Sequence, residues 1–247
     1  MKNFLIEHYI LLTKSFEILA AITGIVVYKN YKHSPAKYFI FFLIYVALLE
    51  LVGGYVRQVR PDKSLHFLMG TLFEKNYWLY NLGWHLGAIL FFVFYYYKVL
   101  KTKSFKTLLK NIGYFYLCFS IVYIFSNGID FFYKSFIILK VTGAIIIFTC
   151  CALYFIELLQ SQKILLFFKS LSFYITVVIL IWWLIITPLS FYDVYYSSVD
   201  LSKPFRHPDF FGDLNYATLK KRIYLFSNTF MYLTYTFALI WCRPQKI

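Results

Sequence analysis

Two acidic side chains lie within stretches of the sequence that are otherwise apolar. Glu50 is the one charged residue between positions 38 and 56, and Glu17 interrupts the first apolar run of the chain. A carboxylate in the middle of a bilayer costs about 3 kcal/mol on insertion scales, so it faces the protein interior and finds a partner there. Intramembrane carboxylates often bind protons, ions or ligands. We therefore expect both groups to be buried between helices, at a candidate ligand or proton site.

Four further polar side chains are expected at a similar depth. Asn81 and His85 are four residues apart and share one face of a helix, and Lys14 precedes Glu17 by one turn. Lys140 lies near the start of another apolar segment. The candidate ligand or proton site therefore comprises six residues: Glu50, His85, Glu17, Lys14, Asn81 and Lys140.

Glycines flank this candidate site on two segments. Gly53 and Gly54 follow Glu50 closely, and two more glycines at positions 83 and 87 bracket His85. Small residues let transmembrane helices approach each other. We therefore expect Glu50 and His85 to share a hydrogen bond or a proton, with Lys14 and Glu17 as a neighbouring pair. The alternative, that these polar groups only fasten helices together, stays open.

The composition assigns the elements that carry these residues to a membrane. Hydrophobic residues make up 61% of the chain and charged residues 15%, whereas a soluble domain has about 25% charged residues. Phe and Tyr are abundant, with 29 and 24 copies, alongside frequent Ile, Lys and Asn. This is typical of an AT-rich bacterial genome, so the expected location is a bacterial inner membrane. We ascribe most of the aromatic residues to that bias.

Seven apolar segments predict one all-α, polytopic transmembrane domain over residues 1–247. A helix rises about 1.5 Å per residue, so about 20 residues cross the hydrocarbon. A break is expected at Pro188, followed by an outer loop at 190–218. Six spans remain an alternative, with the first or fourth segment failing to cross. The predicted spans are 9–28, 38–56, 77–99, 112–125, 132–159, 164–189 and 223–242.

Lysines between the spans predict the orientation. The links after the first, third and fifth spans and the C-terminal tail are rich in lysine and nearly free of acids. The positive-inside rule assigns them to the cytoplasm, with the N-terminus outside. The link after the second span is also basic, with Arg57, Arg60 and Lys63, and argues the other way.

The most basic of these links is a candidate docking site. Five lysines lie within and beside it: Lys98, Lys101, Lys103, Lys106 and Lys110. Such a cluster can bind an acidic protein, nucleic acid or anionic lipid. Setting the topology and contacting lipid headgroups is the alternative role for the same lysines.

The sequence offers no motif for catalysis. HExxH, GxSxG and a glycine-rich phosphate loop are missing, and the four cysteines show no metal-ligand spacing. We therefore expect no catalytic residues, no metal and no cofactor.

These features favour a non-enzymatic accessory or regulatory membrane protein. It would work through a soluble or membrane protein partner, of the signalling or nucleic-acid-guided defence type, and sense a ligand or pH at the outer polar pocket. The second hypothesis is a small ion or proton channel or transporter that uses Glu17, Glu50 and His85. The inner half of the spans, almost purely apolar, speaks against it. An intramembrane enzyme ranks third. The expected contacts are the bilayer and the protein partner, with weaker support for nucleic acid, and a homo-oligomer is left open.

Overall fold

The computed structural model describes residues 8–161, 167–200 and 210–242, and all regular secondary structure in them is helical. Within those residues seven helical segments are long and apolar enough to cross a membrane. This confirms the predicted all-α fold with seven candidate spans. The spans are Tyr9–Tyr31, Ala36–Gln58, Tyr77–Val99, Lys103–Asn127, Ile137–Leu159, Leu171–Tyr192 and Tyr216–Trp241.

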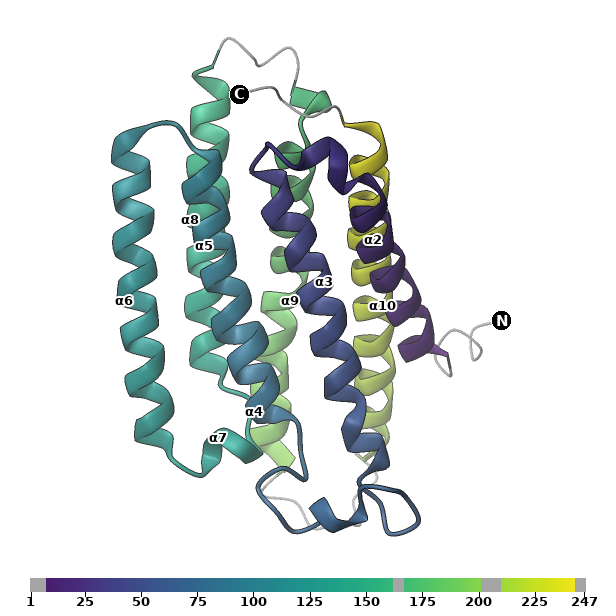
Figure 1. Cartoon of the computed structure of the whole chain (residues 1–247). Helices are drawn as coiled ribbons and strands as arrows, with labels where there is room; N and C mark the ends of the chain where they lie inside the picture. Colours follow the sequence, from purple (N-terminus) through teal and green to yellow (C-terminus); the bar gives the residue numbers. More distant parts are fainter. Residues whose placement is uncertain (1–7, 162–166, 201–209, 243–247) are drawn as a thin grey trace.

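The elements follow one another as an up-and-down bundle (Figure 1). Long apolar runs favour helices here because a helix satisfies its own backbone hydrogen bonds inside a bilayer. The longer α-helices are α2 (Tyr9–Tyr31), α3 (Ala36–Gly53), α5 (Ile89–Val99), α6 (Lys103–Asn127), α8 (Ile137–Leu159), α9 (Leu171–Asp200) and α10 (Phe210–Trp241). The shorter elements are η1 (Gly54–Gln58), η2 (His66–Leu68), α4 (Tyr77–Tyr80), η3 (Asn81–Ala88) and α7 (Asp130–Tyr133).

The third span changes its helical form along its length. It starts as α4, continues as the π-helical η3 and ends as α5. A π-helix pairs each amide with the carbonyl five residues earlier, and such turns are frequent at functional sites. The polar residues Asn81 and His85 lie within η3.

The bundle has two ends that differ in their links (Figure 1). The α2–α3 and α5–α6 links lie at one end, which we call the lysine end. The segment 54–76 and α7 lie at the other, which we call the Glu50 end. Along the bundle α2 packs against α3 and α10, α9 against α8 and α10, and α5 against α6 and α8. The helix α6 lies at one side and is the least buried of the seven spans.

Aromatic side chains fill the centre of the bundle. Phe39 and Tyr235 are buried and meet edge to face, with ring centroids 4.8 Å apart. Phe42 stacks on Phe91 at 4.2 Å. Phe42 and Tyr235 also line a cavity of about 10 Å³ with apolar walls, which holds at most one water molecule. The aromatic residues that we ascribed to compositional bias therefore build much of the core.

Several helix boundaries differ from the prediction. The fourth span begins at Lys103 instead of residue 112, because lysine is a good helix former and its long side chain reaches the interface. The sixth span continues through Pro188 to Asp200. Transmembrane helices tolerate proline, because neighbouring helices and local changes in the helix can satisfy the carbonyl group that it leaves unpaired.

The predicted outer loop at 190–218 is therefore wrong over most of its length. Helix α9 extends to Asp200 and α10 begins at Phe210. Residues 201–209 lie outside the described residues.

Candidate functional site

Glu50 connects α3 to the third span. Its Oε2 accepts a hydrogen bond from the Tyr80 hydroxyl at 2.9 Å, and its Oε1 accepts one from the Trp84 indole nitrogen at 3.2 Å. Tyr80 and Trp84 are four residues apart, so they present their donors from one face of the span. Each carboxylate oxygen of Glu50 thus has its own donor.

Lys14 lies beside Glu50 but binds its backbone. The Lys14 ammonium donates to the Glu50 carbonyl oxygen at 2.6 Å. A Cβ added at Gly54 would lie 3.3 Å from the Lys14 nitrogen, so the glycine leaves room for this contact. The predicted Lys14–Glu17 pair is therefore replaced by a bridge from α2 to the end of α3.

Glu17 is the most buried ionisable group of this cluster. Only 3% of its surface is exposed, and its Oε1 has no hydrogen-bond partner. Glu50 and Lys14 are near enough for their charges to act on it. The buried Tyr232 of α10 is within electrostatic reach of both Glu17 and Glu50. Two carboxylates and one ammonium therefore meet where α2, α3 and α10 approach the third span.

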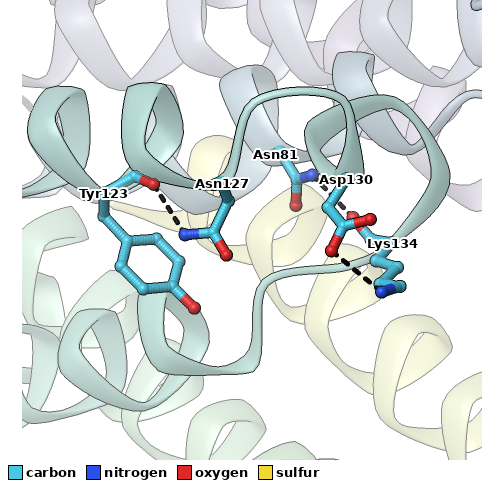
Figure 2. A network of polar contacts seen from close by, with 5 residues as sticks. All are labelled: Asn81, Tyr123, Asn127, Asp130 and Lys134. Atoms are coloured by element: carbon cyan, nitrogen blue, oxygen red, sulfur yellow. Dashed lines mark hydrogen bonds and ion pairs between the residues drawn. The ribbon is translucent and has the colours of Figure 1, made fainter.

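Asn81 belongs to a second polar network, on another side of η3. It is fully buried, and its amide nitrogen donates to the carbonyls of Phe131 at 3.1 Å and Lys134 at 2.9 Å. Its amide oxygen accepts from the backbone nitrogen of Phe136 at 3.1 Å. Figure 2 shows Asn81 beside the turn that carries the exposed Asp130–Lys134 ion pair.

These bonds explain another boundary. The fifth span, predicted from residue 132, begins at Ile137 after the short helix α7. The backbone between α7 and α8 leaves the helical hydrogen-bond pattern, and Asn81 supplies the missing partners. One buried side chain thus sets where two helices are joined.

His85 lies in the same second network. Its Nε2 is 3.3 Å from the hydroxyl of Ser135, and its backbone carbonyl accepts a hydrogen bond from the Tyr116 hydroxyl of α6. The Tyr116 hydroxyl also donates to the carbonyl of Leu139 at 3.2 Å. Lys140 is close enough for its charge to act on His85. This network joins η3 to α6 and α8.

The six predicted site residues therefore form two groups. Lys14, Glu17 and Glu50 come together, and Asn81, His85 and Lys140 gather on another side of η3. The expected Glu50–His85 hydrogen bond does not occur, and each side chain has other partners. The reason is local, because His85 directly follows Trp84 and the two side chains leave the helix in different directions.

Close contact between the second and third spans is confirmed. A Cβ added at Gly83 would lie 2.5 Å from Leu49 Cδ1, and the Tyr45 hydroxyl donates to the Gly83 carbonyl at 3.0 Å. A Cβ at Gly53 would lie 2.8 Å from the Tyr80 hydroxyl. These glycines leave room for the side chains of Leu49 and Tyr80 at the depth of Glu50.

Aromatic partners of Glu50 are the residues that sequence analysis missed. The Trp84 ring stacks on Trp182 of α9 at 6.3 Å, and the Trp182 nitrogen donates to Asn228 Oδ1 at 2.7 Å. The network thus continues from α3 through η3 and α9 to α10. The four-residue spacing of Tyr80 and Trp84, one position before Asn81 and His85, was the available signal.

The half of the bundle toward the lysine end is less apolar than expected. The Tyr95 hydroxyl and the Ser172 hydroxyl are 2.9 Å apart, and the Tyr96 hydroxyl donates to Thr176 Oγ1 at 2.9 Å. Both tyrosines are fully buried. Hydroxyl pairs between α5 and α9 therefore add polar groups where the sequence suggested almost none.

At the lysine end, Glu157 of α8 holds the α5–α6 link by its backbone. Its carboxylate accepts from the Lys101 amide at 2.8 and 3.0 Å and from the Thr102 amide at 2.9 Å. Thr102 is the N-cap residue of α6. A carboxylate here satisfies amides that the first helical turn leaves unpaired, and it interacts well with the helix dipole.

The five lysines of the candidate docking site keep their charges available. Four of them are exposed at the ends of α5 and α6, and Lys106 is half-buried. None of these five described residues forms an ion pair. Lys98 and Lys106 lie over the Tyr97 ring, with nitrogens 5.7 and 5.8 Å from its centre.

Two further observations concern metal binding and similarity to known proteins. No group of three or more His, Cys, Asp or Glu residues that could hold a metal occurs among the described residues. Comparison with protein-family models, curated proteins and solved structures found no match. The function therefore has to be argued from the residues themselves.

Proposed function

We propose that this chain is a non-enzymatic accessory or regulatory protein of a bacterial inner membrane, which docks an acidic partner protein at its lysine end. The observation that carries this proposal is that the Glu157 carboxylate binds the backbone of the α5–α6 link. The carboxylate engages the backbone amides of Lys101 and Thr102, so the link is fixed while the neighbouring ammonium groups form no ion pair with a described residue.

Electrostatics supports a protein partner at this end. Four exposed ammonium groups, on a fixed link and on the ends of α5 and α6 beside it, form a positive patch that attracts an acidic surface and speeds its association. By the positive-inside rule this end faces the cytoplasm, where soluble partners of the signalling or nucleic-acid-guided defence type occur. Charges on a rigid backbone also give a defined pattern, which favours one partner over another.

The test is co-purification from native membranes in mild detergent, with protein and nucleic acid both identified. Lys101, Lys103 and Lys106 are neutralised together to Gln in one variant. A matched control neutralises Lys29 and Lys32, two exposed lysines near the α2–α3 link at the same end. We expect a partner with the wild type and the control, and at least about tenfold less with the triple variant.

Three results would contradict the proposal. The chain could be recovered alone or only with its own copies. The partner could bind the triple variant as well as the wild type. Nucleic acid or anionic lipid could account for all lysine-dependent binding in place of a protein.

A second candidate function is a small proton channel or transporter. It is favoured by the buried hydroxyls of Tyr95 and Tyr96, which extend polar groups from the carboxylate region toward the lysine end. The apolar walls of the central cavity argue against a continuous water path. Purified protein in liposomes would show proton flux that Glu50→Gln abolishes, and an absence of flux above that of empty liposomes would reject this candidate.

A further inference from the structure

We propose that the carboxyl group of Glu17 is a proton-binding site, and that it holds a proton while α2, α3 and α10 are packed as in the structure. The sequence places Glu17 in a candidate ligand or proton site without naming what binds there. Its surroundings are specific enough to name the bound species.

Burial is the first argument. Glu17 is 3% exposed, and its Oε1 has no hydrogen-bond partner. An ionised carboxylate in such a place loses its water shell and receives no donor in return, which is strongly unfavourable. By contrast, each carboxylate oxygen of the less buried Glu50 accepts a hydrogen bond. A neutral carboxyl group avoids the cost of a buried, unpaired charge.

Charge balance is the second argument. One ammonium group faces two carboxyl groups here: Lys14 is bonded to the backbone carbonyl of Glu50, and its charge also acts on Glu17. A second negative charge on Glu17 would remain unbalanced inside the spans. The titratable groups near Glu17 and Glu50 come from every helix that meets there: Lys14 and Tyr9 from α2, Glu50 from α3, Tyr80 from α4 and Tyr232 from α10.

The chemistry of these neighbours selects a proton over a metal cation. Lys14, Tyr80 and Trp84 all act as hydrogen-bond donors here. A metal cation such as calcium needs six or more oxygen ligands with free lone pairs. Both Glu50 carboxylate oxygens and the Glu50 carbonyl already accept hydrogen bonds. A proton needs one oxygen alone, and Glu17 Oε1 supplies it.

Loss of this proton would act on the packing of α2. The released charge would lie beside Glu50, and repulsion and burial would together favour separation of α2 from α3 and α10. Release of the Glu17 proton could thus be the signal to which the proposed regulatory protein responds. The test of the Glu17 site requires no partner, so the two proposals can fail independently.

Infrared spectroscopy of the purified full chain in a detergent without ester groups, dodecyl maltoside, tests the inference, since a protonated carboxyl group has a carbonyl-stretch band that ionised carboxylates and amides lack. We expect this band at neutral pH in the wild type and in the control Glu157→Gln. We expect Glu17→Gln to abolish it. An absent band in the wild type, or a band that persists in Glu17→Gln, would overturn the proposal.

A second measurement keeps the inference testable if Glu17→Gln is poorly expressed. The folded protein would bind one more proton than the unfolded chain near neutral pH, so stability must fall as pH rises. We expect the melting temperature of the wild type to drop between neutral and alkaline pH. A melting temperature that stays level or rises over that interval would overturn the proposal.

Discussion

At the scale of single residues, Asn81 shows how much one buried amide can determine. Its three hydrogen bonds all go to the backbone of α7 and of the α7–α8 link. Asn81→Ala would leave buried backbone groups unpaired, and we expect it to lower the free energy of unfolding by about 3 kcal/mol. Denaturant titration of the purified protein in detergent measures this loss.

Asn127 provides the matched control. Its side-chain amide donates to the Tyr123 carbonyl within α6 at 2.8 Å, and it is only half-buried (Figure 2). We expect Asn127→Ala to cost less than about 1 kcal/mol. Equal losses for the two substitutions would show that Asn81 has no special part in joining α7 to α8.

Tyr80 tests the role of Glu50 as a fastener between helices. Tyr80→Phe removes the hydroxyl that donates to Glu50 Oε2, and interhelical hydrogen bonds in membranes contribute about 0.6 kcal/mol on average. A double-mutant cycle with Glu50→Ala, which removes the acceptor, should give a coupling of that size. Strictly additive effects of the two substitutions would indicate that the bond contributes nothing to stability.

The buried carboxylates can be recognised in the sequence, but their partners cannot. Glu17, Glu50, Asn81 and His85 are all predictable, because polar groups stand out in apolar runs. Their partners are aromatic side chains or backbone atoms, which do not stand out in this chain. Which side of η3 each residue faces depends on the π-helical turn, and no residue pattern in the segment predicts that turn.

At the scale of elements, Gly83 controls the contact between α3 and η3. A Cβ at this position would lie 2.5 and 2.6 Å from the two methyl carbons of Leu49. We expect Gly83→Ala to destabilise the protein by about 1–3 kcal/mol, as overpacking of a core does. Thermal unfolding in detergent measures this effect, and Leu49→Ala in the same chain should relieve part of it.

Gly54 gives a glycine control on the neighbouring element η1. A Cβ there would meet only the flexible end of Lys14, at 3.3 Å. Gly54→Ala should therefore be tolerated within about 1 kcal/mol, since the lysine can shift. A larger loss for Gly54→Ala than for Gly83→Ala would contradict this account of the helix contact.

The α5–α6 link makes a separate prediction. Glu157→Ala removes the acceptor for the backbone amides of Lys101 and Thr102, as loss of a helix cap does, at a cost of about 1 kcal/mol. Hydrogen exchange at these two amides should become faster, while exchange at the centre of α6 stays the same. Unchanged exchange at both amides would show that Glu157 does not hold the link.

Element boundaries were harder to predict than the elements themselves. Seven spans follow from hydropathy alone, because length and apolar composition are sufficient to define them. The start of α6 at Lys103 and the passage of α9 through Pro188 depend on snorkelling lysines and on local backbone bonding. Both effects come from the bilayer and the surrounding helices, so the local sequence carries little sign of them.

At the scale of the whole molecule, the proposed docking function depends on how the chain is oriented in the membrane. The two ends differ in their exposed groups: the lysine end carries the α5–α6 link with its free ammonium groups, and the carboxylate cluster lies toward the Glu50 end. Docking of a soluble cytoplasmic partner requires the lysine end to face the cytoplasm. The other end also carries basic residues, Arg57, Arg60 and Lys63, which favour the opposite orientation under the positive-inside rule. The orientation therefore has to be measured.

Cysteine labelling in intact cells is the most direct measurement of this claim. Single cysteines would replace Lys103 at the lysine end and Lys63 at the Glu50 end, with the four native cysteines changed to Ser or Ala. Both positions are exposed, so access depends on the side of the membrane alone. We predict that a membrane-impermeant thiol reagent labels position 63 in intact cells and position 103 only after permeabilisation. Labelling of position 103 in intact cells, with position 63 protected, would place the lysines outside and contradict the account.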